Sequence, residues 1–167
     1  MSFSIRDVHL GDAEAVIAIL NPIIEARAYT VLDAPFTIAE ERDFIDRFPA
    51  RGVWKIAERQ SDGRVVGFQT LEPFGPYTRA FDHVASIGTF VALDQKRRGI
   101  ATALFSASFR AARDKGFEKL FTFVRADNPG ALAVYAKHGF TAVGTASRQA
   151  KIDGRYIDEI FIERTLE

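Results

Sequence analysis

The stretch from Leu93 to Leu104, LDQKRRGIATAL, constrains this chain most, because it joins an apolar strand to a helix through three consecutive cations and a glycine. The first turn of a helix leaves about four backbone N–H groups without intrahelical partners, and the peptide dipoles add roughly half a positive charge there. Anions bind at such helix ends. Gly99 keeps a Cβ out of the ligand's way, and the cations raise the local positive potential. The stretch predicts a cradle for a phosphorylated ligand, and a solvated basic loop is the alternative.

The composition excludes several kinds of site and partner. The chain has no cysteine, so disulfides, thiolate metal ligands and a cysteine nucleophile are all excluded. Lysine plus arginine and aspartate plus glutamate number 22 each, which argues against a broad nucleic-acid-binding surface. No stretch approaches the roughly 20 apolar residues of a membrane span, and the first residues lack a signal-peptide pattern. We therefore expect a soluble, cytoplasmic protein without nucleic-acid or membrane partners.

The pattern of the chain predicts one α/β domain over residues 1–167, without a linker or repeat. Apolar residues at helical spacing predict a helix that opens at Gly11-Asp12, and Thr37 with Glu40 forms a capping box for the next one. Gly116 is expected to end a helix as a left-handed cap. The expected strands are 2–9, 53–58, 64–71, 83–93, 117–124, 140–150 and 155–163, and the other expected helices are 37–48, 99–115 and 128–138.

A second stretch with chemical potential runs from Arg125 to Phe140. Asn128 suits a helix N-cap, Pro129 suits the first helical position, and Gly139 suits the helix end. Tyr135 follows Asn128 by two helical turns and lies on roughly the same face. Taken alone, Tyr135 fits a half-buried core aromatic better than it fits an acid.

Together the two stretches resemble the GNAT superfamily of acyl-CoA N-acyltransferases. The family's phosphate loop, Gln/Arg-x-x-Gly-x-Gly/Ala, matches residues 96–101 with lysine as a mild departure at its first position, and Asn-Pro-x-Ala-x-x-x-Tyr-x-Lys-x-Gly-Phe matches residues 128–140. Phe74-Gly75-Pro76 and the hairpin at Gly154-Arg155-Tyr156 are most similar to the phosphinothricin-type branch, which acetylates small amino-acid-like amines. The resemblance implies a single-domain GNAT-like α/β fold, with flanking helices on a mixed, mostly antiparallel sheet that contains two splayed parallel strands.

The resemblance also implies acetyl-CoA as co-substrate. The backbone of Val91 and Leu93 would pair with the amides of the pantetheine arm, which enters between the splayed strands. Asn128 would hydrogen-bond to the arm near its sulfur end, and Tyr135 would face the thioester sulfur. The residues implied to hold the pyrophosphate are Arg97, Arg98, Gly99, Ile100, Ala101 and Thr102.

The implied chemistry is direct transfer. A neutral amine attacks the thioester carbonyl, a backbone N–H of the long strand stabilises the oxyanion, and Tyr135 protonates the departing thiolate. The phosphinothricin-type branch carries a glutamate on the strand before the phosphate loop, and this chain has Ser86 there. The group that takes the amine proton is therefore left open between water and three side chains, Glu72, Asp82 and His83.

The acceptor pocket is less legible. The resemblance assigns it to residues 29–36, residues 74–81 and the hairpin near Tyr156, with an arginine available for a carboxylate. The candidate substrate-binding residues are Tyr29, Phe36, Phe74, Tyr77 and Arg79. Much of this aromatic content suits the core or a dimer contact equally well, and a homodimer is expected. The three histidines, His9, His83 and His138, lie too differently in the pattern to suggest a metal site, and we expect no metal.

Three functional hypotheses follow. The first is an N-acetyltransferase for a small amino-acid-like amine. The second is an acetyltransferase of protein N-termini or lysines, which would need an open groove instead of an aromatic cup. The third is a non-catalytic acyl-CoA sensor, against which Asn128 and Tyr135 argue and for which the missing glutamate argues.

Overall fold

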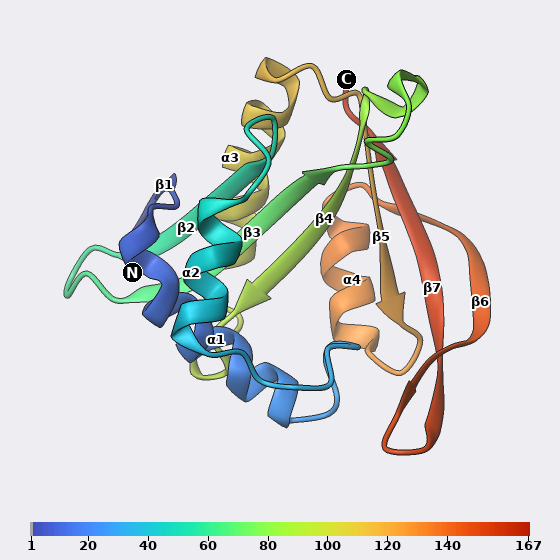
Figure 1. Cartoon of the computed structure of the whole chain (residues 1–167), viewed down its shortest axis with the longest axis horizontal. Coiled ribbons are helices and arrows are strands. Elements are labelled where there is room, and N and C mark those ends of the chain that lie inside the picture. The colour runs from blue at the N-terminus through green and yellow to red at the C-terminus, as the bar shows by residue number, and fades with distance from the viewer. Residues whose placement is uncertain (1) are drawn as a thin grey trace.

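A seven-stranded mixed sheet of order β1-β2-β3-β4-β5-β7-β6 organises the chain in the computed structural model, which describes residues 2–167 (Figure 1). The strands are β1 (Phe3–Asp7), β2 (Val53–Arg59), β3 (Val65–Pro73), β4 (Val84–Val91), β5 (Lys119–Arg125), β6 (Thr141–Ile152) and β7 (Arg155–Thr165). Neighbouring strands are antiparallel except β4 and β5, which are parallel. The predicted mixed, mostly antiparallel sheet is confirmed.

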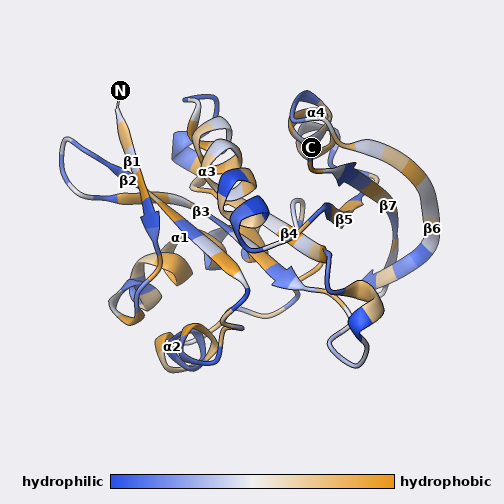
Figure 2. Ribbon diagram, turned by 90° about the horizontal axis from the view of Figure 1, so that it is seen from above, coloured by the Kyte–Doolittle hydropathy of each residue, from blue (hydrophilic) through white to orange (hydrophobic). Residues whose placement is uncertain are grey.

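Helices cover both faces of this sheet. They are α1 (Ala13–Glu25), α2 (Ile38–Asp46), α3 (Ile100–Asp114) and α4 (Pro129–Lys137). The end-on view shows α1 and α2 on one side of the sheet and α3 and α4 on the other (Figure 2). The predicted capping box is present, since Thr37 Oγ1 accepts from the Glu40 backbone at 3.2 Å while Glu40 accepts from the Thr37 backbone at 2.8 Å. Within residues 2–167, no helix is long and apolar enough to span a bilayer.

The apolar core is split between the two faces of the sheet. On the α3 side Phe105, Leu120 and Leu71 are fully buried, and on the α1 side Val16 and Ile24 are. Burying a side chain of this size stabilises the fold by about 1.5–3 kcal/mol. The sheet is therefore held rigidly from both sides, which fixes the positions of the side chains that it presents.

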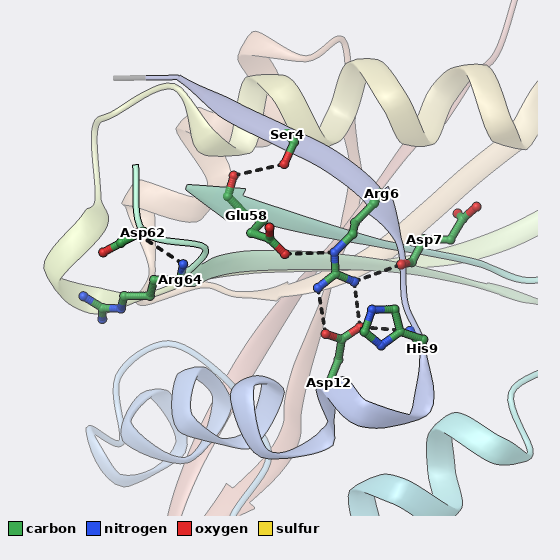
Figure 3. A network of polar contacts seen from close by, with 8 residues as sticks. All are labelled: Ser4, Arg6, Asp7, His9, Asp12, Glu58, Asp62 and Arg64. Atoms are coloured by element: carbon green, nitrogen blue, oxygen red, sulfur yellow. Dashed lines mark hydrogen bonds and ion pairs between the residues drawn. The ribbon is translucent and has the colours of Figure 1, made fainter. Parts of the chain in front are cut away.

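A polar network fixes where α1 starts (Figure 3). Arg6 of β1 donates two hydrogen bonds to the Asp12 carboxylate, both at 2.8 Å, and a third to Glu58 of β2 at 3.0 Å. Burial acts to raise the pKa of Asp12, but the hydrogen bonds from Arg6 and from the His9 backbone outweigh it, so this pKa is lowered. The network ties the start of α1 to the first two strands.

The parallel pair separates along its length, as predicted. β4 and β5 are paired only over Val84–Ser86 and Lys119–Phe121, whereas β4 stays paired with β3 as far as Val91. Beyond Ser86 the two strands diverge, which is visible in the directions of their arrows in Figure 1. The backbone of β4 facing this gap has no strand beside it there.

Most element ends differ from the predicted ones by a residue or two, and the difference at the end of β4 bears on the site. The strand was expected to run to Leu93, but it ends at Val91 and Leu93 begins a 3₁₀ turn. The Ala92 N–H still donates to the Val66 carbonyl across the sheet at 2.9 Å. The Gln95 N–H then donates to the Ala92 carbonyl at 2.9 Å, which closes the turn. Leu93 is therefore not a strand residue, and the pairing of its backbone with the pantetheine arm stays a prediction.

Candidate active site

A cavity of about 560 Å³ lies where the α1–α2 side of the sheet meets the gap between β4 and β5. Its walls come from the loop after α1, from α2, from β2 to β5, from α4 and from β7. The aromatic residues that line it are Tyr29, Phe36, Phe44, Trp54, Phe68, Phe90, Phe123 and Tyr135. The cavity therefore joins a largely apolar chamber to the place where the strands separate.

The floor of the cavity follows from the two-residue period of β-strands. Alternate residues of β3 and β4 point to the same face, and they meet there as the register pairs Phe68–Phe90, Thr70–Gly88 and Glu72–Ser86. A Cβ on Gly88 would lie 3.2 Å from Thr70 Oγ1 and 3.2 Å from the Phe90 ring. Glycine therefore keeps this part of the floor open.

Tyr135 of α4 lines the cavity with its hydroxyl held in a hydrogen-bonded chain. The Tyr135 oxygen lies 3.0 Å from Thr89 Oγ1, which accepts from Gln69 Nε2 at 2.8 Å. Its ring packs edge-on against Phe105 and Phe140. Burial raises the pKa of Tyr135 to about 12, although the Thr89 hydrogen bond opposes this. The hydroxyl is therefore protonated at neutral pH, and it is a weaker acid than an exposed tyrosine.

The basic loop, which carries Lys96, Arg97 and Arg98, has a backbone conformation suited to binding an anion. Gly99 is the N-cap of α3 with φ +82°, and nothing lies within 4 Å of where its Cβ would be. No side chain caps the helix, so the N–H groups of Ile100, Ala101 and Thr102 face outward from its first turn. Arg97 also adopts a positive φ of 63°. The arrangement provides several N–H donors and positive charge at one helix end.

Asn128 caps α4 as predicted, and it also binds the loop after α1. Its side-chain oxygen accepts from the Ala131 backbone at 3.2 Å, and its Nδ2 donates to the Tyr29 carbonyl at 3.3 Å. Lys96 of the basic loop lies over the Tyr29 ring, 3.7 Å from its centroid. The loop after α1 is therefore tied both to the basic loop and to the start of α4.

Three glutamates with perturbed titration line the cavity. Burial raises the pKa of Glu41 to about 6 and raises that of Glu72. Burial also raises the pKa of Glu159, against the effect of nearby Arg125. Within residues 2–167, no group of three or more His, Asp and Glu side chains is placed to hold a metal ion.

The three side chains considered as the general base differ in whether they line the cavity. Glu72 lines the cavity, whereas Asp82 and His83 do not. Reasoning from the sequence missed Glu41 and Glu159. Weak signals existed for both: Glu41 lies four residues before Ile45 in α2, and Glu159 lies two residues after the buried Ile157 in β7.

The five candidate substrate residues fall into two groups. Tyr29 and Phe36 line the cavity, but Phe74, Tyr77 and Arg79 do not, so the five residues do not meet in this cavity. Phe74 packs against other aromatic rings, Tyr77 is 81% exposed, and the Arg79 side chain is 98% exposed. The physical reason is the position of the turn after β3. It leads into the start of β4, where β4 is still paired with β5, whereas the cavity opens beyond Ser86, where the two strands separate.

Comparisons with known proteins identify the family and the fold. The model of the acetyltransferase (GNAT) family matches residues 21–140. The chain is 22% identical over 167 residues to the L-methionine sulfoximine/L-methionine sulfone acetyltransferase of Pseudomonas aeruginosa, covering 100% of this chain and 96% of that one. It is 24% identical over 159 residues to the phosphinothricin N-acetyltransferase of Streptomyces coelicolor, covering 93% and 91%. A phosphinothricin acetyltransferase from Sinorhizobium meliloti, solved in complex with AcCoA, has the same fold, with a TM-score of 0.90 at 20% identity over 99% of this chain and 89% of that one.

Proposed function

The chain belongs to the acetyltransferase (GNAT) family, and from this premise we propose that it transfers the acetyl group of acetyl-CoA to the primary amine of a small amino-acid-like molecule. One observation carries the proposal: a buried proton donor, Tyr135, and an unpaired carboxylate, Glu72, line one cavity that continues into the gap between β4 and β5. The full-length relatives named for methionine sulfoximine and phosphinothricin act on amino-acid analogues, which supports this substrate class.

The residues present fit acetyl-CoA as the bound co-substrate. The open first turn of α3 and the arginines before it suit a pyrophosphate, which residues 97–102 would hold. The free edge of β4 up to Val91 suits the amide groups of an extended arm. When bound, acetyl-CoA supplies an acetyl thioester. A cysteine-free chain provides no thiol to carry the acetyl group, so we propose direct transfer to the amine.

Tyr135 is proposed to donate the proton that the departing sulfur needs. Because Thr89 Oγ1 accepts from Gln69, the Thr89 hydroxyl is free to donate to the Tyr135 oxygen. The Tyr135 proton is then free to point into the cavity. With its raised pKa the hydroxyl keeps its proton at neutral pH. The catalytic effect of Tyr135 would come from its position against the sulfur, where negative charge develops.

Glu72 is proposed to take the proton that the amine must lose. It lines the cavity beside its register partner Ser86, so its carboxylate stands one strand away from the position where the phosphinothricin-type branch carries a glutamate. Burial raises its pKa, which makes it a better proton acceptor than an exposed carboxylate. The proton then passes to solvent, and Tyr135 is reprotonated from solvent.

A homodimer is proposed as well. Phe74, Tyr77 and Val143 are exposed apolar residues outside the cavity, and burial in a second copy would remove them from water. Sedimentation equilibrium should give twice the mass of one chain, and Tyr77→Asp should shift it toward the single-chain mass. A single-chain mass for the unmodified protein would contradict the proposal.

The function is tested by measuring thiol release from acetyl-CoA with a panel of amines. The panel contains amino acids, methionine sulfoximine, phosphinothricin, amino-acid derivatives, polyamines and peptides with free N-termini. The expected result is thiol release with small amino-acid-like amines and an acetylated product by mass spectrometry. Release with peptides alone would favour a protein acetyltransferase, and acetyl-CoA binding without release would favour a sensor.

A further inference from the structure

Two carboxylates of the cavity, Glu41 and Glu72, lack counter-ions among residues 2–167. Glu41 is only 4% exposed, yet within residues 2–167 it has no ion pair and no hydrogen bond from another residue. Glu72 is partly buried and likewise has neither. Glu159 is also buried, but Arg125 lies near it and partly offsets the effect of burial on its pKa. Buried carboxylates normally sit against a cation or a set of donors, because an isolated charge loses its hydration on burial. The missing partner is therefore expected from the molecule that fills the cavity.

The arginine in the cavity wall, Arg125, already has hydrogen-bond partners within the chain. Arg125 is 6% exposed, and its guanidinium donates to Asp127 at 2.8 and 2.7 Å. It also donates to the carbonyls of Arg27 and Thr30, at 2.9 and 3.0 Å. Arg79, the arginine expected to bind a carboxylate, lies outside the cavity beside Asp82. Among residues 2–167, those that line the cavity therefore offer no free guanidinium or ammonium group to an acceptor's carboxylate.

A buried hydrogen-bond donor in the same wall also lacks a partner. Trp54 is 3% exposed, lines the cavity, and its Nε1 has no hydrogen-bond acceptor. Leaving a buried donor unpaired costs about 1–3 kcal/mol. Trp54 belongs to an aromatic row with Phe44, Phe68 and Phe90, with successive ring centroids 5.4, 6.1 and 4.9 Å apart. An uncharged carbonyl oxygen on the ligand would satisfy the indole N–H.

From these observations we propose that the acceptor is a positively charged amine with an apolar side chain and no free carboxylate, of the amino-acid amide class. The inference rests on the proposed function. The ammonium group is attracted to the glutamates and to the aromatic faces, the side chain fills the apolar chamber, and the neutral carbonyl accepts from Trp54. A free carboxylate would enter a cavity that already carries negative charge, which opposes its desolvation.

Turnover tests the inference with matched amines. L-Phenylalaninamide and 2-phenylethylamine should each give a kcat/KM at least tenfold above that of L-phenylalanine, with methionine sulfoximine also below both. The comparison of 2-phenylethylamine with phenylalanine is informative because the amine of 2-phenylethylamine is no easier to deprotonate. A higher kcat/KM for 2-phenylethylamine would therefore come from its missing carboxylate. Equal or better use of phenylalanine or methionine sulfoximine would overturn the inference and leave the proposed function intact.

Binding tests it without turnover. By calorimetry with the acetyl-CoA-free protein at pH 7.5, 2-phenylethylamine should bind at least tenfold more tightly than 3-phenylpropionate, which has the same ring and the opposite charge. If no amine releases thiol but this preference is found, the proposed function fails and the cavity still selects cations. Equal or tighter binding of the anion overturns the inference whatever the activity.

A variant pair locates the effect in the cavity. Glu41→Gln should weaken 2-phenylethylamine binding at least fivefold without altering the acetyl-CoA-induced rise in Tm. Asp46→Asn, the same charge change on the exposed side of α2, should bind the amine like the unmodified protein. Unchanged binding by Glu41→Gln, or an equal loss in both variants, would overturn the electrostatic basis of the inference.

Discussion

The two halves of the active site are encoded differently. The half proposed to bind acetyl-CoA consists of β4, the basic loop, α3 and the start of α4, and its key groups lie in two continuous stretches of sequence. The acceptor half draws Leu20, Glu41, Trp54, Glu72 and Glu159 from separate elements onto one cavity. A helix end is a local backbone property, so short motifs specify it, whereas an acceptor pocket depends on which distant side chains the fold brings together.

The largest expected effect tests the residue where the halves meet. Tyr135→Phe removes the hydroxyl and keeps the ring packed on Phe105, so kcat should fall by about 10² to 10⁴ with little change in acetyl-CoA binding. Steady-state thiol release and an acetyl-CoA thermal shift measure the two quantities. Tyr77→Phe is the control, because that tyrosine is exposed and outside the cavity. Full activity in Tyr135→Phe would leave orientation of the reactants as the source of rate.

The next prediction moves a carboxylate within the acceptor half. Glu72→Gln should lower kcat/KM by about 10² and remove the loss of activity at acidic pH, because a base must be deprotonated to act and burial raises the pKa of Glu72. Ser86→Glu in the same chain places a carboxylate on the paired position of β4 and should recover roughly tenfold. An unchanged pH profile in Glu72→Gln would instead assign proton removal to water.

Much of the fold, and the backbone features of the half proposed to bind acetyl-CoA, could be predicted for a physical reason. The strand–loop–helix stretch around Gly99, the capping of α4 by Asn128 and the splay of β4 from β5 depend on backbone rules that apply within a few residues, or on the family resemblance. The end of β4 was predicted two residues too late because Ala92 still bonds across the sheet before the chain turns.

The acceptor half was less predictable. Phe74 and Tyr77 were expected in the pocket because the family resemblance assigns it to residues 74–81, which are rich in aromatics. The place of this turn at the paired end of β4 follows from the sheet register, which the sequence does not state. Glu41 was missed because a glutamate in the first turn of a helix is ordinarily explained by the helix dipole. Its burial depends on α2 packing against the sheet at Trp54.

A third prediction concerns the half proposed to bind acetyl-CoA. Gly99→Glu places a side chain and a negative charge at the open start of α3, so the stabilisation by a hundredfold excess of acetyl-CoA over its Kd, about 2.7 kcal/mol, should be lost. Gly63→Glu is matched to it, since Gly63 also has a positive φ, of +70°, and open space around its Cβ position. Both variants should lose similar intrinsic stability in urea, and only the first should lose the acetyl-CoA effect. An equal ligand response in both would refute the phosphate-loop assignment.

The smallest effect is a pH dependence of stability that belongs to the acceptor half alone. Burial raises the pKa of Glu41 from 4.5 to about 6, so the folded chain holds this proton more tightly than the unfolded chain does. Relative to Glu41→Gln, the protein should therefore be most stable below about pH 4.5 and should lose up to about 2 kcal/mol as the pH rises through 6. Urea unfolding of both proteins at pH 4.5 and pH 8 measures the difference, with Asp46→Asn as the control.

The direction of that change separates a ligand-binding carboxylate from a structural one. A structural carboxylate is held by donors that lower its pKa, as Arg6 does for Asp12, and its stabilising contribution is lost on acidification. Glu41 should behave in the opposite way, because the fold supplies no partner for its charge. A cationic amine bound at pH 8 should then restore part of the lost stability in the unmodified protein and less of it in Glu41→Gln. Parallel stability profiles for the two proteins would mean that Glu41 remains hydrated and that the acceptor half stores no unpaired charge.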